Sequence, residues 1–317
     1  HICPNDDFWV RDNGPIFVQD AEGEWVILDW GFNGWGGDTP YELDDAVPAS
    51  IASALSILSI DLSAMVLEGG AIEIDGNGTL MATRSSITQD DRNPDLTESE
   101  IEGYLSEYLG IQQFIWLDGQ FGGSEDITDQ HIDGFVKFVG DHTVVTMNNS
   151  DLAYWYVSPS DRAIIDDAAN VEGVPYERVN LPLTQYPVQT TWGQNVGFRS
   201  TYVNYYVANE VVLVPNYDDP RDEVANDIIQ GLYPDRMVVG INCQNILLWG
   251  GMVHCVTQQQ PIGAAPMSLN DYPSHGEKEE LVMMFDLLGR LLPHPIKGQP
   301  HLKVYNSGRV EKVVERE

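Results

Sequence analysis

Hydrophobic and polar residues alternate along much of the chain with the period of two that is typical of half-buried β-strands. In four places two such strands flank a short turn containing Gly, Asp or Asn, which predicts a β-hairpin. The four predicted hairpins span residues 14–30, 69–84, 132–148 and 202–217. Residues 249–257 (WGGMVHCVT) have the pattern of a fifth first strand.

Helical patterns lie between these hairpins. They cover residues 44–58, 97–109, 160–170 and 220–231. Thr97 and Glu100 have the spacing of a capping box at the start of the second helix. Hairpins alternate with helices at spacings of roughly 50–70 residues, which favours a cyclic repeat architecture. We therefore predict an α/β fold, a closed five-bladed α/β propeller of ββαβ-type repeats with the ends of its first strands around the centre.

The two ends of the chain differ from the middle. The start, His1-Ile2-Cys3-Pro4, has the pattern of the end of a strand, so we expect a chain that lacks an N-terminal part and a first blade that is incomplete. From Glu277 onward there are seven acidic and seven basic residues, whereas the rest of the chain is strongly acidic. This shift predicts a propeller domain at residues 1–265 and an extension at residues 266–317.

The extension is expected to be a helix followed by a hairpin. Residues 277–292 have an amphipathic pattern that is ended by two prolines, which predicts a helix. The segment after them predicts a hairpin with its turn at Asn306-Ser307-Gly308.

The amino-acid composition limits the classes of function and partner that fit this protein. The 317 residues carry 49 acidic and 16 basic side chains, a net charge of −33, and 43% of them are hydrophobic. That hydrophobic fraction excludes wholesale disorder. The negative charge argues against nucleic acid and anionic membranes as partners and favours a small cationic substrate. Three cysteines cannot form a disulfide framework.

Reactive side chains stand at the starts of the predicted hairpins or in the fifth strand. They are Asp12, Glu68, His131, Asp133 and Cys255. In a propeller these five would converge on the axis. A thiol with an imidazole and carboxylates is typical of a nucleophilic site, and the surplus carboxylates suit a guanidinium, whose planar fork pairs with them. With no further closely spaced His or Cys cluster, we expect neither a metal nor an organic cofactor.

The sequences around these residues resemble the agmatine deiminase family, which is related to bacterial peptidylarginine deiminases. The motifs are DDFWVRDNGP (6–15), FNGWGG (32–37), LEGGAIEIDGNGTLMATR (67–84), DQHIDGFVKF (129–138), STYVNYYVANEVVLVP (200–215) and GGMVHCVTQQQP (250–261). The resemblance is collinear from Asp6 to Pro261. It implies the pentein fold of the guanidino-group-modifying superfamily, a five-bladed α/β propeller.

The resemblance also implies residue roles. Cys255 would be the nucleophile, His131 the acid–base residue and Glu68 its support, while Asp12 and Asp133 would grip the guanidinium. The implied reaction converts agmatine to N-carbamoylputrescine and ammonia through a covalent amidino-cysteine intermediate.

Trp9 is expected to be part core and part pocket wall, where its ring can stack on a guanidinium. His254 is expected to face away from Cys255, because neighbouring residues of a strand point to opposite faces. Three positions depart from the family pattern: Gln130 replaces the usual Gly, and Gly134 and Met252 replace Asn. These departures leave the specificity at the far end of the substrate open.

Two other functions fit the same residues. One is a secreted peptidylarginine deiminase, and the other is a non-catalytic propeller that binds guanidines or polyamines. A cytoplasmic location is expected, with secretion left open because an N-terminal part is expected to precede this chain. Oligomeric state is left open as well, with a homodimer as one arrangement.

Overall fold

The computed structural model of the protein describes residues 3–120, 126–261, 281–286, 292, 294–295, 300–305 and 310–314. The chain divides into two compact units, His1–Ala264 and Ala265–Glu317. The first unit contains all the residues that sequence analysis assigns to a site.

Four three-stranded sheets of one design make up the first unit in the part of it that is described. In each sheet the first two strands form an antiparallel hairpin, and the third strand runs parallel to the second. The strands are β1 (Ile16–Gln19), β2 (Trp25–Gly31) and β3 (Leu58–Val66); β4 (Ile72–Ile74), β5 (Thr79–Thr83) and β6 (Gln113–Leu117); β7 (Lys137–Val139), β8 (Thr143–Met147) and β9 (Glu177–Leu181); and β10 (Tyr206–Val207), β11 (Val211–Asn216) and β12 (Met237–Asn242). The four predicted hairpins and the mixed α/β fold are confirmed.

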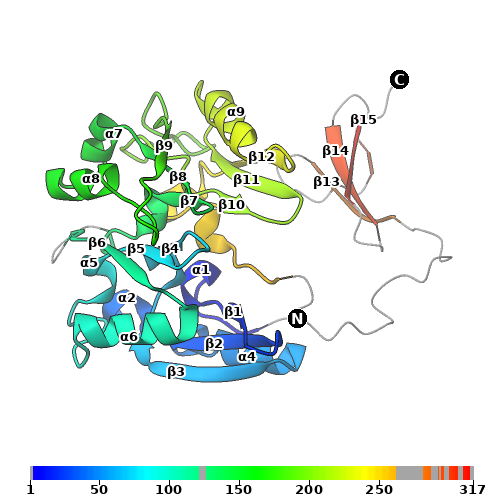
Figure 1. The fold of residues 1–317 in the computed structure, drawn as a ribbon. Coiled ribbons are helices and arrows are strands. Elements are labelled where there is room, and N and C mark those ends of the chain that lie inside the picture. The colour runs from blue at the N-terminus through cyan, green and yellow to red at the C-terminus, as the bar shows by residue number, and fades with distance from the viewer. Residues whose placement is uncertain are drawn as a thin grey trace. The chain divides into compact units, whose positions relative to one another are not determined.

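Helices connect the second strand of each sheet to its third. They are α2 (Gly34–Gly37), α3 (Glu42–Asp45), α4 (Val47–Leu55), α5 (Arg84–Ile87), α6 (Glu98–Leu109), α7 (Asn149–Tyr154), α8 (Pro159–Asp166) and α9 (Asp222–Leu232). The longer helices α4, α6, α8 and α9 lie on the outside of the unit, whereas the short α1 (Val10–Asn13) lies near its middle (Figure 1). Parallel strands need such crossovers, so each hairpin is followed by one.

Helix α6 illustrates how local sequence sets these boundaries. Thr97 and Glu100 form the expected capping box, and Gly110 ends the helix in a left-handed conformation at φ 70°. Ile101 and Leu105 lie one turn apart and are fully buried. They belong to an apolar cluster shared with the first two sheets, and a second cluster lies under the third and fourth.

The prediction of a strand at residues 249–257 is wrong. Trp249 is the last residue of a 3₁₀ turn, η3 (Ile246–Trp249), which ends at Gly250 with φ 97°, and a second 3₁₀ turn, η4 (His254–Val256), follows. The described part of this unit therefore holds no fifth sheet. The first sheet has three strands like the next three.

The second unit contains one antiparallel sheet in its described residues. Strand β14 (Pro300–Tyr305) pairs with β13 (Leu281–Asp286) and with β15 (Val310–Val314). The predicted hairpin is confirmed, although its turn residues 306–308 lie outside the described residues. The helix predicted over 277–292 is wrong, since Leu281–Asp286 is a strand. A short apolar run such as LVMMF fits either structure, and pairing with β14 decides it.

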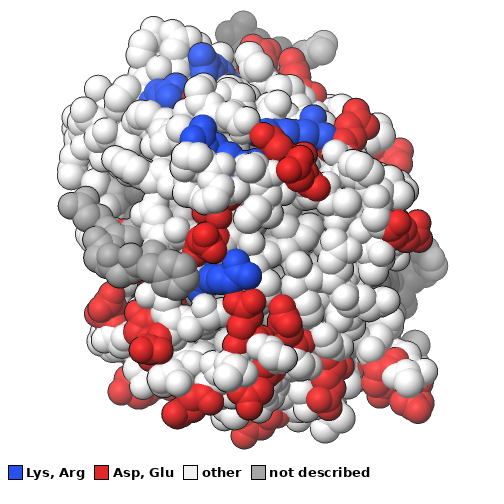
Figure 2. Space-filling model, turned by 60° about the vertical axis from the view of Figure 1, so that its left-hand side comes forward, with Lys and Arg blue, Asp and Glu red and all other residues white. Residues whose placement is uncertain are grey.

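Acidic side chains gather on the face drawn in Figure 2, over its lower part, where Figure 1 places the first sheet and α6. Lys and Arg are sparse on the same face. In the described residues no helix has the length and apolar character needed to cross a membrane.

Candidate active site

Asp12 enters the middle of the first unit from α1. Its Oδ2 accepts a hydrogen bond from the indole nitrogen of Trp35 at 3.0 Å, and its Oδ1 accepts one from the backbone nitrogen of Gly70, also at 3.0 Å. The carboxylate is buried, and burial raises its pKa even though His131 opposes the shift. Neutral donors therefore fix this carboxylate in place, so that one face of it can meet a cation.

Glu68 and His131 form a buried pair. The Nε2 of His131 lies 2.6 Å from Oε2 of Glu68, while Nε of Arg92 lies 2.9 Å from Oε1 of Glu68. The other imidazole nitrogen, Nδ1, lies 3.6 Å from Oδ1 of Asp12. Burial disfavours the imidazolium, but Asp12, Glu68 and Asp133 outweigh it and raise the pKa of His131 to about 9. His131 is thus a protonated acid at neutral pH.

Asp133 lies on η2 (Ile132–Gly134), two residues after His131. Its Oδ2 is 2.7 Å from Nδ1 of His254 and 3.0 Å from the amide nitrogen of Asn204. Burial is the main cause that raises the pKa of Asp133 to about 7. This carboxylate is consequently balanced between its protonated and ionised forms near neutral pH.

Cys255 lies on η4. Its Sγ is 3.6 Å from Oδ1 of Asn204, and its side chain is only partly exposed. Burial, followed by the negative charges of Asp133 and Asp12, raises the pKa of the thiol well above its usual range. Without a bound cation, Cys255 therefore rests as a thiol.

Gly70 marks the point where these side chains converge. A Cβ atom at this residue would lie 2.6 Å from Nδ1 of His131, 2.8 Å from Oδ1 of Asp12 and 3.2 Å from Oδ2 of Asp133. Three reactive groups from two distant segments thus crowd around one hydrogen atom of the glycine. The close approach explains why glycine is required at this place.

Backbone strain precedes His131. Asp129 and Gln130 have φ angles of 53° and 72°, a region that side chains with a Cβ rarely adopt. Arg92 holds the strained segment, because its Nη1 lies 2.7 Å from Oδ2 of Asp129 while its Nε holds Glu68. One buried guanidinium thus sets the positions of both the imidazole and its carboxylate partner.

Trp9 is buried in an apolar cluster with Phe32 and Trp35, against which Cys255 packs. A Cβ at Gly251 would lie 2.2 Å from the Trp9 ring. Trp9 therefore packs beside the segment that carries the thiol, which confirms that it is part of the core.

Residues 1–261 match the Porphyromonas-type peptidyl-arginine deiminase family. The chain belongs to this family. It is 36% identical over 283 residues to a Latilactobacillus sakei protein named "Putative agmatine deiminase", and the match covers 82% of this chain and 76% of that one.

Solved structures of family relatives share the fold. The structure described as the "Putative Arginine Deiminase" of Porphyromonas gingivalis superposes with a TM-score of 0.74 at 34% identity, covering 83% of this chain and 78% of that one. Agmatine deiminase of Enterococcus faecalis gives a TM-score of 0.73 at 28% identity, covering 82% and 76%. The suspected relationship to agmatine deiminases is confirmed by these matches.

Sequence reasoning misplaced or missed three residues of the site. His254 was expected to face away from the site, but it lies on a 3₁₀ turn rather than a strand, and its ring contacts Asp133. Asn204 contacts Asp133 and Cys255, and its place inside a family-like motif was the signal for it. Arg92 lies between α5 and α6 in no recognisable pattern, so only the structure places it beside Glu68.

The three departures from the family pattern also have structural partners. The Gln130 side chain donates to the backbone oxygen of Trp155, and a Cβ at Gly134 would lie 3.3 Å from the same indole ring. The sulfur of Met252 accepts a hydrogen bond from the Tyr217 hydroxyl at 2.9 Å. Gln130 and Gly134 thus both abut Trp155.

The arrangement supports covalent chemistry on a cation. A thiol, a protonated imidazole and two carboxylates of raised pKa face one small region, and Arg92 keeps the supporting Glu68 in place. Among the described residues, no group of three or more His, Cys, Asp or Glu side chains is arranged to hold a metal ion.

Proposed function

We propose that this protein hydrolyses the guanidinium of agmatine to N-carbamoylputrescine and ammonia, with Cys255 as the nucleophile. The convergence of Asp12, His131 and Asp133 around Gly70 carries the proposal, because it supplies two carboxylates and an acid for one planar cation. The names of the L. sakei and E. faecalis relatives support agmatine as the substrate.

Binding of the substrate activates the thiol. In the resting site Cys255 is protonated and His131 is an imidazolium. A guanidinium held between Asp12 and Asp133 places a positive charge beside Sγ and offsets the carboxylates that raise the pKa of the thiol. The thiol then releases its proton to solvent, which leaves a thiolate beside the carbon to be attacked.

The first half-reaction breaks a C–N bond. The thiolate attacks the central guanidinium carbon and forms a tetrahedral adduct whose nitrogens are held by Asp12 and Asp133. His131 gives its proton to the departing amino group, which leaves as ammonia. An amidino thioether on Cys255 remains, and the imidazole is neutral.

The second half-reaction breaks the C–S bond. Neutral His131 accepts a proton from a water molecule, whose oxygen attacks the thioether carbon. Collapse of the new adduct expels the Cys255 thiolate, releases the remaining hydroxyl proton to solvent and forms the ureido product, N-carbamoylputrescine. Glu68 supports both halves, because it stays bonded to Nε2 of His131 and stabilises the imidazolium whenever it forms.

We further propose that the four sheets of the first unit are blades of a five-bladed pentein propeller and that residues 1–265 are its deiminase domain. The repeated topology of the four sheets supports this arrangement. So does the origin of the site residues, which come from segments that precede or begin successive sheets.

An ammonia-release assay on agmatine, free arginine and an arginine-containing peptide tests the function. Agmatine and arginine differ by one carboxylate, and burying an unpaired charge costs several kcal/mol. In a chain with a net charge of −33 we therefore expect agmatine to exceed arginine at least roughly a hundredfold in kcat/KM. A preference for the peptide would replace the agmatine assignment with peptidylarginine deimination.

Labelling with a haloacetamidine separates either enzyme from a non-catalytic binding protein. Modification of Cys255 that agmatine prevents supports turnover at this thiol. Absence of labelling together with absence of ammonia release would contradict both enzymatic assignments.

A further inference from the structure

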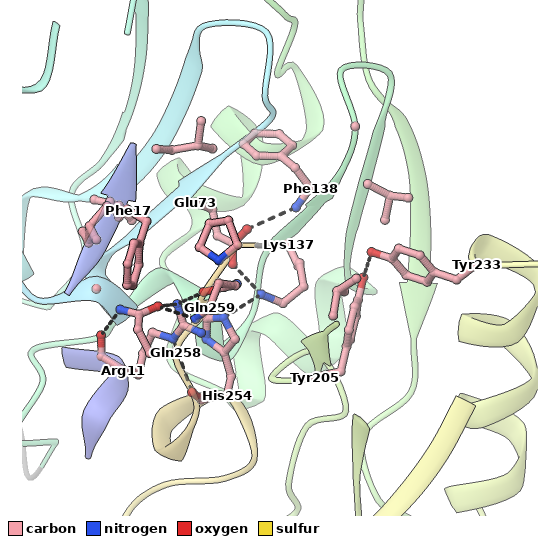
Figure 3. Close-up of a pocket in the computed structure, with 18 residues that line it drawn as sticks. Arg11, Phe17, Glu73, Lys137, Phe138, Tyr205, Tyr233, His254, Gln258 and Gln259 are labelled. Atoms are coloured by element: carbon pink, nitrogen blue, oxygen red, sulfur yellow. Dashed lines mark hydrogen bonds and ion pairs between the residues drawn. The ribbon is translucent and has the colours of Figure 1, made fainter. Parts of the chain in front are cut away.

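A series of charged and polar contacts connects Asp133 with His254, Lys137 and Glu73. Nδ1 of His254 lies 2.7 Å from Oδ2 of Asp133, and Nε2 of the same ring lies 3.5 Å from Nζ of Lys137. Lys137 in turn lies 2.5 Å from Oε1 of Glu73. All four side chains are buried. Figure 3 shows the last three of them, Glu73, Lys137 and His254, lying in sequence.

Glu73, Lys137 and His254 line a cavity of about 420 Å³. Arg11, Glu73, Lys137, Tyr205 and His254 are among its lining residues, and neither Cys255 nor His131 is. His254 thus lies between the cavity and the candidate active site. Its ring contacts Lys137 on the side of the cavity and Asp133 on the side of the active site.

The partners of His254 select one form of its ring. An ammonium is a donor only, so the Nε2 that faces Lys137 must carry a lone pair. An ionised carboxylate is an acceptor only, so the Nδ1 that faces Asp133 must carry the proton. Burial, followed by the positive charges of Arg11, Lys137 and His131, lowers the pKa of His254 well below its usual range. The ring is consequently neutral, with its single proton on Nδ1.

We propose that His254 is a positioning residue, whose neutral imidazole links the Lys137–Glu73 ion pair to Asp133, favours the ionised form of that carboxylate and fixes its orientation in the site. This inference rests on the proposed function, since it assigns Asp133 to the guanidinium. The bonds from His254 and Asn204 both end on Oδ2 of Asp133. The same oxygen lies 3.2 Å from the position of a Cβ at Gly70, so these two bonds fix the carboxylate where the site residues converge.

Several other groups act on the same carboxylate, and a pH test must account for them. The titratable or charged groups that bear on the ionisation of Asp133 are Arg11 and Asp12 from α1, Glu73 from β4, His131 from the segment before η2, Lys137 from β7, and His254 and Cys255 from η4. Arg11 adds to the field at His254, because its Nε is bonded to the His254 backbone oxygen. Variants that change only His254 leave all the others in place.

Nuclear magnetic resonance of the full chain labelled with ¹⁵N-histidine reads the ring directly, and the chain has only seven histidines. His254 is assigned by the resonance that disappears in His254→Asn. Between about pH 8 and 9, where Asp133 is ionised, we expect the neutral Nδ1–H tautomer, and a mixture of tautomers in the double variant Glu73→Gln, Lys137→Gln. An imidazolium or an Nε2–H tautomer in the wild-type protein would overturn the proposal.

Kinetics supply the second readout. His254→Phe removes the donor to Asp133, so the acidic limb of kcat/KM should move to higher pH by at least about one unit, with KM rising more than kcat falls. His254→Asn keeps a donor near the Nδ1 position and should restore the limb. His142→Gln, at an exposed histidine, is the matched control and should leave kcat, KM and the acidic limb unchanged.

The outcomes separate this proposal from the proposed function. An unmoved limb in His254→Phe, or an Asn variant no better than Phe, contradicts the positioning role. A wild-type protein that releases no ammonia from any guanidinium contradicts the function, and the histidine spectrum then still decides the role of His254.

Discussion

Replacing Gly70 with alanine tests whether the geometry around this residue is what allows turnover. The added Cβ would lie 2.6 Å from Nδ1 of His131, whereas ordinary contact begins near 3.4 Å. The imidazole or the backbone must therefore move by roughly 0.8 Å. A misplacement of about 1 Å costs on the order of a hundredfold in rate, or about 2.7 kcal/mol of transition-state stabilisation.

We expect Gly70→Ala to lower kcat for ammonia release from agmatine by about a hundredfold. Asp12 and Asp133 are also crowded, at 2.8 and 3.2 Å, so KM should rise too. Gly103→Ala is the matched control, because a Cβ at Gly103 of α6 meets nothing within 4 Å. That variant should keep full activity and gain roughly 0.5–1 kcal/mol of stability.

Steady-state kinetics and thermal unfolding of both variants show whether the loss of activity comes from crowding at Gly70 or from a loss of stability. Wild-type kcat in Gly70→Ala would refute the reasoning, because the three groups would then tolerate a shift that the site is argued to forbid. A loss of activity with equal loss in Gly103→Ala would show that the effect is not local to the site.

Three further predictions concern individual side chains. Cys255→Ser should abolish turnover in the ammonia assay, whereas Cys243→Ser should retain it, since burial raises the pKa of Cys243 to about 12 and makes that thiol inert. In a pH profile kcat/KM should rise through about pH 7, as Asp133 ionises, and fall above about pH 9, as His131 loses its proton; a flat profile from pH 6 to 10 would contradict both assignments. Asp12→Asn and Asp133→Asn should each remove a charge-assisted contact of about 1.5–3 kcal/mol and worsen both kcat and KM, and normal kinetics in either would place the guanidinium elsewhere.

Much of the candidate site could be predicted because its residues lie next to regular patterns. Asp12 precedes the first hairpin, Glu68 the second and His131 the third, and the alternation of apolar residues identifies a hairpin from the chain alone. The close approach of these side chains then depends on the arrangement of the repeats, which the alternation of hairpins and helices predicted as a propeller.

The errors arose where a local pattern had two solutions. WGGMVHCVT alternates like a strand, but Gly250 at φ 97° breaks it into 3₁₀ turns, and that change moves His254 from the packing face to Asp133. The apolar run at 281–286 fits a helix until β14 pairs with it. Arg92 carries no pattern at all, since its role depends on Glu68 and Asp129, which are distant in sequence.

The distribution of charge within the site explains why it should prefer a cation to any neutral ligand. Arg92 and His131 lie against Glu68, so that carboxylate is already compensated. Asp12 is bonded to an indole and a backbone amide, and Asp133 to an amide and a neutral imidazole. These neutral partners do not outweigh burial, which keeps the pKa values of both carboxylates raised. A guanidinium between them would relieve the cost of their burial and would lower the pKa of the Cys255 thiol at the same time. In the proposed mechanism the two carboxylates bind the guanidinium, and the positive charge of that same guanidinium activates the Cys255 thiol, so an uncharged amide in the same place would gain neither effect.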